Sequence, residues 1–218
     1  MRPGLNARFT TIGIEQQAHG HTADIDRPLS YAQSADDTAA ALAQLGLGKV
    51  DVFGFSDGGN VGLALALRHP ARVGKLAVLG TQFSRDGLTR ETWAELQKRA
   101  AQEPAEAAAA MPARLREAYE QVAPRREDWS RLVSKVYRQA VGFKGWSEAE
   151  LRGLRGPLLV MVGDRDAVTV EHAARSHGLV PDGALAVLPV TEHVSVMTRP
   201  GWLVEMLEDF LVGVPSKA

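Results

Sequence analysis

Residues 50–59 (VDVFGFSDGG) constrain the fold of this chain most, because a strand, a sharp turn and a helix follow one another there without a spacer. Val50–Phe55 is a compact strand-type run, and Asn60–His69 has a helical pattern that Pro70 ends. The turn contains the pattern G-x-S-x-G, whose glycines leave room where a side chain would collide with the neighbouring strand or helix. This arrangement is typical of a strand in a parallel sheet, followed directly by its crossover helix.

The rest of the chain also alternates strand-type runs with helical patterns. This predicts the α/β class, with a mostly parallel sheet and helices on both of its faces. A helix is predicted from a capping box at Ser30–Gln33 as far as Gly46. The strand-type runs are apolar without alternation, so we expect them to be buried on both faces. Besides Val50–Phe55, the predicted strands are Phe9–Glu15, Gly74–Gly80, Pro157–Gly163 and Ala184–Val190.

The stretch 84–155 differs from its surroundings, because it is rich in Ala, Glu, Arg and Gln and has no convincing strand. Its aromatic and aliphatic residues recur at roughly helical spacing, which predicts three or four helices inserted between strands. A last helix, Gly201–Leu211, should dock on the sheet. We therefore expect a core made of residues 1–83 and 156–218, and a helical cap made of residues 84–155.

Ser56 is the candidate nucleophile of the G-x-S-x-G turn, and its alternative role is a plain helix N-cap. The chain has no cysteine, so no thiolate competes with it. A serine hydroxyl needs a base and an acid that orients the base. Of the 6 histidines, His193 follows the last predicted strand, at the sheet edge where ligands collect, although it could be only a solvated loop residue. Asp164 and Asp166 both leave the carboxyl end of the preceding strand and are candidates for the acid.

These patterns together resemble the α/β-hydrolase family, of the esterase and proline-iminopeptidase-like kind. The resemblance rests on G-F-S-D-G-G at the turn, R-H-P at residues 68–70, G-D-R-D at 163–166 and T-E-H at 191–193, in the order Ser, Asp, His. It implies a catalytic triad of Ser56, His193 and Asp166, rather than Asp164, and it implies no metal or cofactor. It also implies that residues 84–155 are the cap over the site.

Asp57 has two further roles by this resemblance. Its backbone N–H would supply half of the oxyanion hole. S-D-G-G is also similar to the valacyclovirase-like (biphenyl-hydrolase-like) branch, in which this aspartate receives the substrate's α-amino group. A carboxylate that merely favours the helix N-terminus is an equal alternative. The predicted substrate contacts are Asp57 and Phe83.

The resemblance also implies that three early strands and the H-G loop, the source of the second oxyanion donor, have no counterpart here. Loss of one such donor costs about 2.7 to 4 kcal/mol, so weak activity is expected. The family's third strand would lie between Phe9–Glu15 and Val50–Phe55. The first predicted strand must therefore pair directly with the second, or the sheet borrows a strand from another copy, or it exposes an apolar edge. A homodimer through an exposed or exchanged sheet edge follows as one expectation.

The charge and hydropathy of the chain limit the kinds of molecule that it is expected to bind. The 25 basic and 26 acidic residues give a net charge of -1, which does not indicate a nucleic-acid or anionic-membrane partner. No apolar run reaches the roughly 18 residues of a membrane helix, and residues 1–11 do not look like a signal peptide, so a cytoplasmic location is expected. The predicted function is a serine hydrolase of small carboxylic esters, including amino-acid esters. The alternative is a hydrolase-like binding module with little or no turnover.

Overall fold

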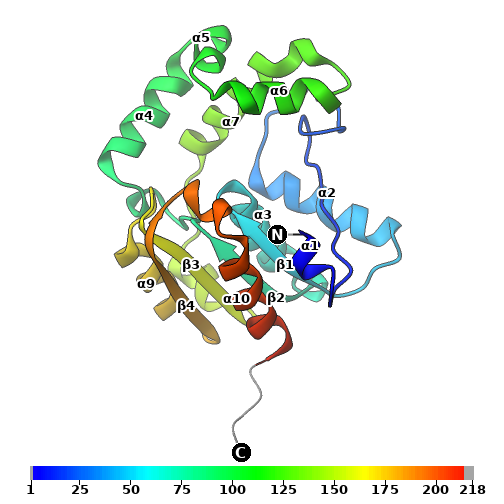
Figure 1. Ribbon diagram of the computed structural model, residues 1–218, viewed down its shortest axis with the longest axis vertical. Helices are drawn as coiled ribbons and strands as arrows, with labels where there is room; N and C mark the ends of the chain where they lie inside the picture. Colours follow the sequence, from blue (N-terminus) through cyan, green and yellow to red (C-terminus); the bar gives the residue numbers. More distant parts are fainter. Residues whose placement is uncertain (1, 214–218) are drawn as a thin grey trace, which may run out of the picture.

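The computed structural model describes residues 2–213. Its sheet has four parallel strands in the order β1-β2-β3-β4, and helices cover both faces, as predicted (Figure 1). The strands are β1 (Val50–Phe55), β2 (Val73–Leu79), β3 (Leu158–Arg165) and β4 (Gly183–Glu192). The α-helices are α1 (Arg2–Leu5), α2 (Tyr31–Gln44), α3 (Asp57–Arg68), α4 (Arg90–Ala101), α5 (Pro104–Ala109), α6 (Ala113–Val122), α7 (Trp129–Gly142), α8 (Glu148–Arg152), α9 (Val170–Leu179) and α10 (Pro200–Val212).

Side chains alternate across the two central strands and build a separate core on each face. Leu76 and Val78 of β2 pack with residues of α2, α3 and α9. Ala77 and Leu79 point to the other face, where they pack with Leu203 and other residues of α10 and with Leu5 of α1. Because successive residues of a strand face opposite sides, one apolar run serves both cores. In β2 and β3 the absence of alternation was therefore a correct sign of burial on both faces.

The two edge strands, β1 and β4, are not buried on both faces. β1 and β4 each have one paired side, and Asp51, Leu185 and Val187 are exposed on them. Burial on both faces thus holds for β2 and β3 but is wrong for the edges. A continuous apolar run cannot reveal whether a second neighbour exists on each side.

The predicted strand Phe9–Glu15 is also wrong: the structure has no strand there, and β1 pairs only with β2 within residues 2–213. Phe9 packs with the α1 and α10 side of the core, and the chain then runs on past β1 without joining the sheet. A β-type sequence becomes a strand only where it has a partner for its backbone groups. Direct pairing of the first predicted strand with the second is therefore wrong, whereas a strand borrowed from another copy stays a prediction.

The helix from Tyr31 begins as expected, because the Ser30 hydroxyl accepts the Gln33 backbone N–H. The Gln33 side chain donates to Asp37, so the return bond of a capping box is not made. The helix ends at Gln44, two residues before Gly46, whose φ of 69° lies in the left-handed region.

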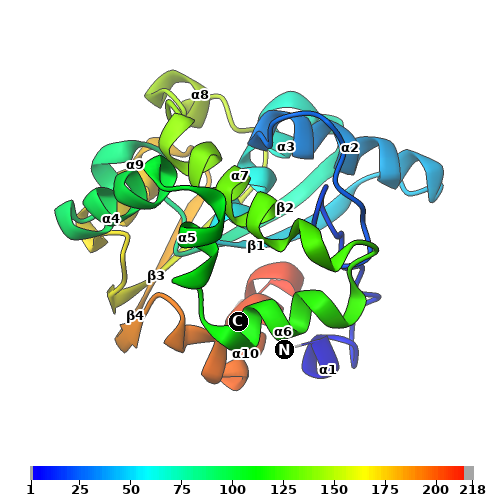
Figure 2. The ribbon, with the colours of Figure 1, turned by 90° about the horizontal axis from the view of Figure 1, so that it is seen from above.

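Residues 84–155 form five α-helices, α4 to α8, where three or four were predicted. Helices α4 to α7 lie beyond the carboxyl ends of the strands, as Figure 1 shows at the top and Figure 2 shows from above. Trp129, Leu132 and Val133 of α7 pack with α5, α6 and Ala18 in a small core of their own. The division into a core and a cap remains a prediction.

Candidate active site

Ser56 lies in the turn between β1 and α3, with φ 53° and ψ -120°. A side chain at Gly54 would meet the Gly58 carbonyl, and one at Gly59 would meet Thr81, so the turn is tight on both flanks. Gly58 itself has nothing within 4 Å of the place a Cβ would take, which corrects the expectation that each glycine of the motif is needed to avoid collision. Ser56 occupies the N-cap position of α3, but its side chain makes no cap hydrogen bond.

Three side chains from three strand ends meet at this turn. His193 Nε2 is 3.0 Å from Ser56 Oγ, and His193 Nδ1 is 2.7 Å from Asp166 Oδ1. The Asp166 side chain is fully buried, and its Oδ1 also accepts the Val168 backbone N–H at 3.1 Å. The geometry fits a relay in which the imidazole carries a proton between serine and substrate and the aspartate orients the ring.

Asp164 and Asp166 lie two residues apart in the chain but make different contacts. The Asp164 carboxylate is exposed and accepts the Thr191 backbone N–H at 2.9 Å, a bond that lowers the pKa of Asp164. It therefore shapes the loop that carries His193, whereas Asp166 contacts the ring itself. Of the two acids left open by the sequence, the structure brings Asp166 to His193.

Two residues that support this arrangement were not found from the sequence. Gly80, directly after β2, has φ 56°, and a Cβ there would lie 2.9 Å from His193 Nδ1 and 3.0 Å from Asp166 Oδ2. The Phe55 ring lies 4.8 Å from the His193 ring, between centroids. Gly80 could have been noticed as a glycine at a strand end facing the site, but Phe55 gave no signal beyond its place in the strand.

Asp57 joins a buried polar group beneath the turn. Its carboxylate accepts the Tyr31 hydroxyl at 2.5 Å. Burial raises the pKa of Asp57, while the bonded Tyr31 and the nearby rings of His19 and His193 act to lower it. Asn60, one turn further along α3, is fully buried and accepts the Trp146 indole N–H at 3.1 Å. Tyr31 was missed because it comes from a helix that is distant in the sequence.

Phe83 is only 3% exposed, and its ring stacks on His172 with centroids 4.1 Å apart. The His172 Nε2 accepts the Phe83 backbone N–H at 3.1 Å, and burial lowers the pKa of His172 to about 4. The imidazole is thus neutral near pH 7 and can act as an acceptor. The predicted contact of Phe83 with substrate stays a prediction, and its ring has little free surface.

Three other histidines make contacts outside the relay. His19 Nδ1 contacts the Gln17 carbonyl, and His21 contacts Glu15 at the surface. His69 contacts Asp36, whose pKa falls to about 2 because Arg68 and His69 both donate to it. In the part of the chain that the structure describes, no group of three His, Cys, Asp or Glu side chains is arranged to hold a metal ion.

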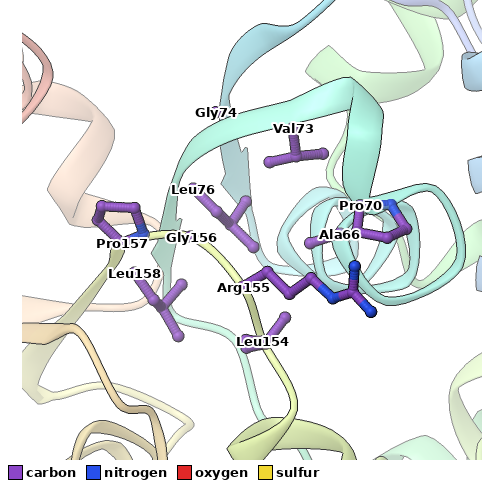
Figure 3. A pocket seen from close by; sticks show the side chains of 10 residues that line it. All are labelled: Ala66, Pro70, Val73, Gly74, Leu76, Leu154, Arg155, Gly156, Pro157 and Leu158. Carbon is purple, nitrogen blue, oxygen red and sulfur yellow. The ribbon is translucent and has the colours of Figure 1, made fainter.

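Two cavities differ in their size and in their position relative to Ser56. A cavity of about 20 Å³ lies where β2 and β3 begin, between Val73, Gly74 and Leu158, with room for about one water molecule (Figure 3). It is at the opposite strand ends from Ser56 and is too small for a substrate. A larger cavity of about 630 Å³ is lined by Tyr31, Phe143 and Trp146, between the start of α2 and the end of α7. Tyr31 lines this cavity, and its hydroxyl donates to Asp57.

Comparison with known proteins identifies the family of the fold. The family model described as alpha/beta hydrolase fold matches residues 1–200. A hydrolase from Pseudomonas aeruginosa PA01 has TM-score 0.73 and 22% identity, over 97% of this chain and 83% of that one. The enol-lactonase from Burkholderia xenovorans LB400 has TM-score 0.70 and 21% identity, over 90% of this chain and 78% of that one. The chain belongs to the α/β-hydrolase fold family.

A narrower similarity concerns one third of the chain. A Caulobacter segnis protein that carries the name carbamate hydrolase RutD is 50% identical over 77 residues, which are 34% of this chain and 29% of that protein. The chain therefore spans under one third of the length of the curated relatives it matches. No helix among residues 2–213 is long and apolar enough to cross a membrane.

Proposed function

We propose that this chain is a serine hydrolase that cleaves small carboxylic esters through an acyl-enzyme. The observation that carries the proposal is the continuous contact from Ser56 Oγ through His193 to Asp166, at 3.0 and 2.7 Å. Ser56 attacks the ester carbonyl while His193 Nε2 takes its proton, and His193 then protonates the departing alcohol. Water repeats the sequence on the acyl-enzyme, which releases the acid and restores Ser56.

The oxyanion would be held first by the Asp57 backbone N–H. This group opens α3, so it has no acceptor within the helix, and the helix dipole also favours a negative charge there. The second donor expected from an H-G loop has no counterpart in the resemblance described above. A site that holds the oxyanion with one donor turns over roughly a hundredfold to a thousandfold more slowly than a site with two. A hydrolase-like binding module without turnover is the competing proposal.

Labelling with a fluorophosphonate probe tests the nucleophile, because the probe forms a stable bond to an activated serine. We expect the wild type to be labelled and Ser56→Ala to remain unlabelled. Ser147→Ala is the matched control, since the exposed Ser147 side chain caps α8 and bonds Glu150 rather than a relay residue, so labelling should be unchanged. Absence of labelling in the wild type, or equal labelling of Ser56→Ala, would refute the nucleophile. Tight ligand binding that Ser56→Ala does not alter would favour the binding module.

Amino-acid esters are the narrower substrate proposal, because the Asp57 carboxylate adjoins the nucleophile and could accept an ammonium group. Tyr31 already donates to one of its oxygens, so the carboxylate is positioned before substrate arrives. We expect Asp57→Asn to reduce the preference for aminoacyl over plain acyl esters, as a ratio of kcat/KM values. An unchanged ratio would show that Asp57 serves only the helix terminus.

Carbamates are the second candidate, favoured by the local similarity to carbamate hydrolase RutD. A carbamate carbonyl offers the same electrophile to Ser56 and needs the same relay. Parallel assays of matched ester and carbamate substrates decide between them, with Ser56→Ala as the blank. We further propose that the substrate is a small molecule, that neither nucleic acid nor a membrane is a partner, and that the protein acts in the cytoplasm.

A further inference from the structure

The end of β4 reaches the relay through a bulge. In the pairing of β3 with β4, Gly163 lies opposite Leu188. The next pair is Arg165 opposite Glu192, so β3 advances by two residues (165 minus 163) while β4 advances by four (192 minus 188). We call the three residues between Leu188 and Glu192 the β4 bulge. A bulge re-aims the side chains that follow it, and His193 comes directly after this one ends at Glu192.

The backbone of the β4 bulge has a conformation that its sequence does not favour. Val190 has φ 51°, and a β-branched residue in the left-handed region is a clear outlier. The Val190 side chain is 56% exposed, so its own packing contributes little to holding it there. A strained backbone of this kind persists only where the surrounding contacts enforce it, and such backbones gather at functional sites.

Asp164 contacts the β4 bulge from the end of β3. Its Oδ1 accepts the Thr191 backbone N–H at 2.9 Å, and Thr191 is fully buried. The backbone amides of Thr191 and Val190 lower the pKa of Asp164, so the carboxylate is a charged acceptor at neutral pH. A hydrogen bond to a charged acceptor is stronger than one between neutral groups.

Arg199 contacts the same bulge from the residue directly before α10. Its Nη1 donates to the Pro189 carbonyl at 2.9 Å and to Thr191 Oγ1 at 3.0 Å. Its Nη2 donates to the Val190 carbonyl at 3.1 Å. The guanidinium lies over the Trp202 ring, 4.7 Å from its centroid. Because the planar guanidinium presents its donors in fixed directions, one side chain binds all three residues of the bulge.

We propose that Asp164 and Arg199 are positioning residues for the reaction of Ser56, an inference that rests on the proposed serine hydrolase. No hydrogen bond or ion pair that they make within residues 2–213 involves a relay side chain. They act on the β4 bulge, and the bulge sets the direction in which the chain carries His193 toward Ser56. If Val190 relaxes to a negative φ, the chain that follows it changes direction and the imidazole moves away.

Kinetics of matched carboxylate variants test this positioning. Asp164→Ala should lower kcat for ester hydrolysis roughly 10- to 100-fold and leave KM within about twofold, since displacement by 1 Å can cost a hundredfold in rate. Asp164→Asn keeps an acceptor oxygen for the Thr191 N–H and should restore kcat to within about threefold of wild type. Asp51→Ala is the control, because the exposed Asp51 carboxylate also accepts a backbone N–H, that of Lys75 at 2.7 Å, but at the start of β1.

Arg199→Met tests the second contact in the same way. It removes all three bonds to the β4 bulge and should lower kcat by a similar factor. Arg199→Lys should not restore kcat, since a single ammonium group cannot replace the planar fork. Arg72→Met is the control, because Arg72 donates to the Leu47 backbone carbonyl at 2.7 Å, away from the bulge, and should leave kcat unchanged.

A second measurement does not need turnover. The chain has no cysteine, so iodoacetamide alkylates the Ser56→Cys variant at one position only. An adjacent imidazole favours the reactive thiolate, and Ser56→Cys combined with His193→Ala gives the rate without it. Adding Asp164→Ala to Ser56→Cys should slow alkylation by about tenfold, because the imidazole is displaced. Adding Asp51→Ala should leave the rate unchanged.

The outcomes separate this inference from the proposed function. Equal kcat in Asp164→Ala and Asp51→Ala, or alkylation of Ser56→Cys that Asp164→Ala does not slow, would overturn the positioning. Failure of Asp164→Asn to restore kcat would also overturn it, because Asp164 would then act by its charge rather than by its bond to Thr191. If fluorophosphonate does not label the wild type but Asp164→Ala still slows alkylation, the proposed hydrolase falls and the positioning of His193 stands.

Discussion

Gly80 gives a sharp test of the relay, because it combines an unusual backbone conformation with a close approach to two of the three side chains. Its φ of 56° lies in the left-handed region, where an L-residue costs about 1–2 kcal/mol. A Cβ at this position would also lie 2.9 Å from His193 Nδ1 and 3.0 Å from Asp166 Oδ2. Gly80→Ala therefore carries a backbone cost and a steric cost.

The steric cost falls on the catalytic distances. Ordinary Cβ contacts begin at 3.4 Å, so the neighbours must retreat by 0.5 Å (3.4 minus 2.9) and 0.4 Å (3.4 minus 3.0). A movement of this size would stretch the 3.0 Å contact between His193 and Ser56 to the limit of a hydrogen bond. Since misplacement by 1 Å can cost a hundredfold in rate, we expect a loss of roughly 10- to 100-fold. The added crowding should cost about 1–3 kcal/mol of stability.

Gly46→Ala is the matched control, because Gly46 has φ 69° and nothing within 4 Å of its Cβ position. Both variants should lose about 1–2 kcal/mol from the backbone. The rate of fluorophosphonate labelling and of ester hydrolysis should fall only in Gly80→Ala, at temperatures where both variants are folded. Equal rates in the two variants would refute the claim that Gly80 makes room for the relay.

Three other changes test single contacts. His172→Gln should flatten the pH dependence of the free energy of unfolding. Folding lowers the pKa of His172 from 6.5 to about 4, so the neutral imidazole contributes about 2 kcal/mol of stability after solvent screening. This contribution is present above pH 6.5 and is lost as the pH falls toward 4. Lys135→Met removes a cation 2.7 Å from the buried Asp24 carboxylate and should cost about 2–3 kcal/mol in urea unfolding; no loss would show that Arg131 alone suffices. Tyr31→Phe removes a bond that lowers the pKa of Asp57, so KM for amino-acid esters should rise at neutral pH more than KM for plain esters, and an equal rise would count against the ammonium site.

Much of the candidate site could be predicted because it depends on local signals and on one rule of parallel sheets. Ser56, Asp166 and His193 each follow the carboxyl end of a strand, and such ends meet at one edge of the sheet. Strand assignments accurate to one or two residues were sufficient for this, since the loops bring the side chains together. The choice between Asp164 and Asp166 needed either the resemblance or the structure.

Other features depend on contacts between distant segments, which leave no local pattern. Phe9–Glu15 has the composition of a strand, but whether it pairs depends on a neighbour at the free side of β1. Tyr31 reaches Asp57 from α2, and nothing near Tyr31 in the sequence indicates that contact. The expectation that a side chain at Gly58 would collide was wrong for a related reason. Whether a glycine is needed depends on the space around it, which its place in the motif does not reveal.

The relay and residues 10–14 belong to separable parts of the molecule. The relay is carried by the ends of β1, β3 and β4 and by Gly80 after β2, which are the paired strands. Residues 10–14 instead lead into the loop that holds His19, whose ring acts on the pKa of Asp57. A change in this segment should therefore reach the loop on the substrate side and leave the relay distances unchanged. On this reasoning Ile14→Lys should raise KM for amino-acid esters while the fluorophosphonate labelling rate of Ser56 stays within about twofold of wild type, because shifts below about 0.4 kcal/mol need no change in a relay contact.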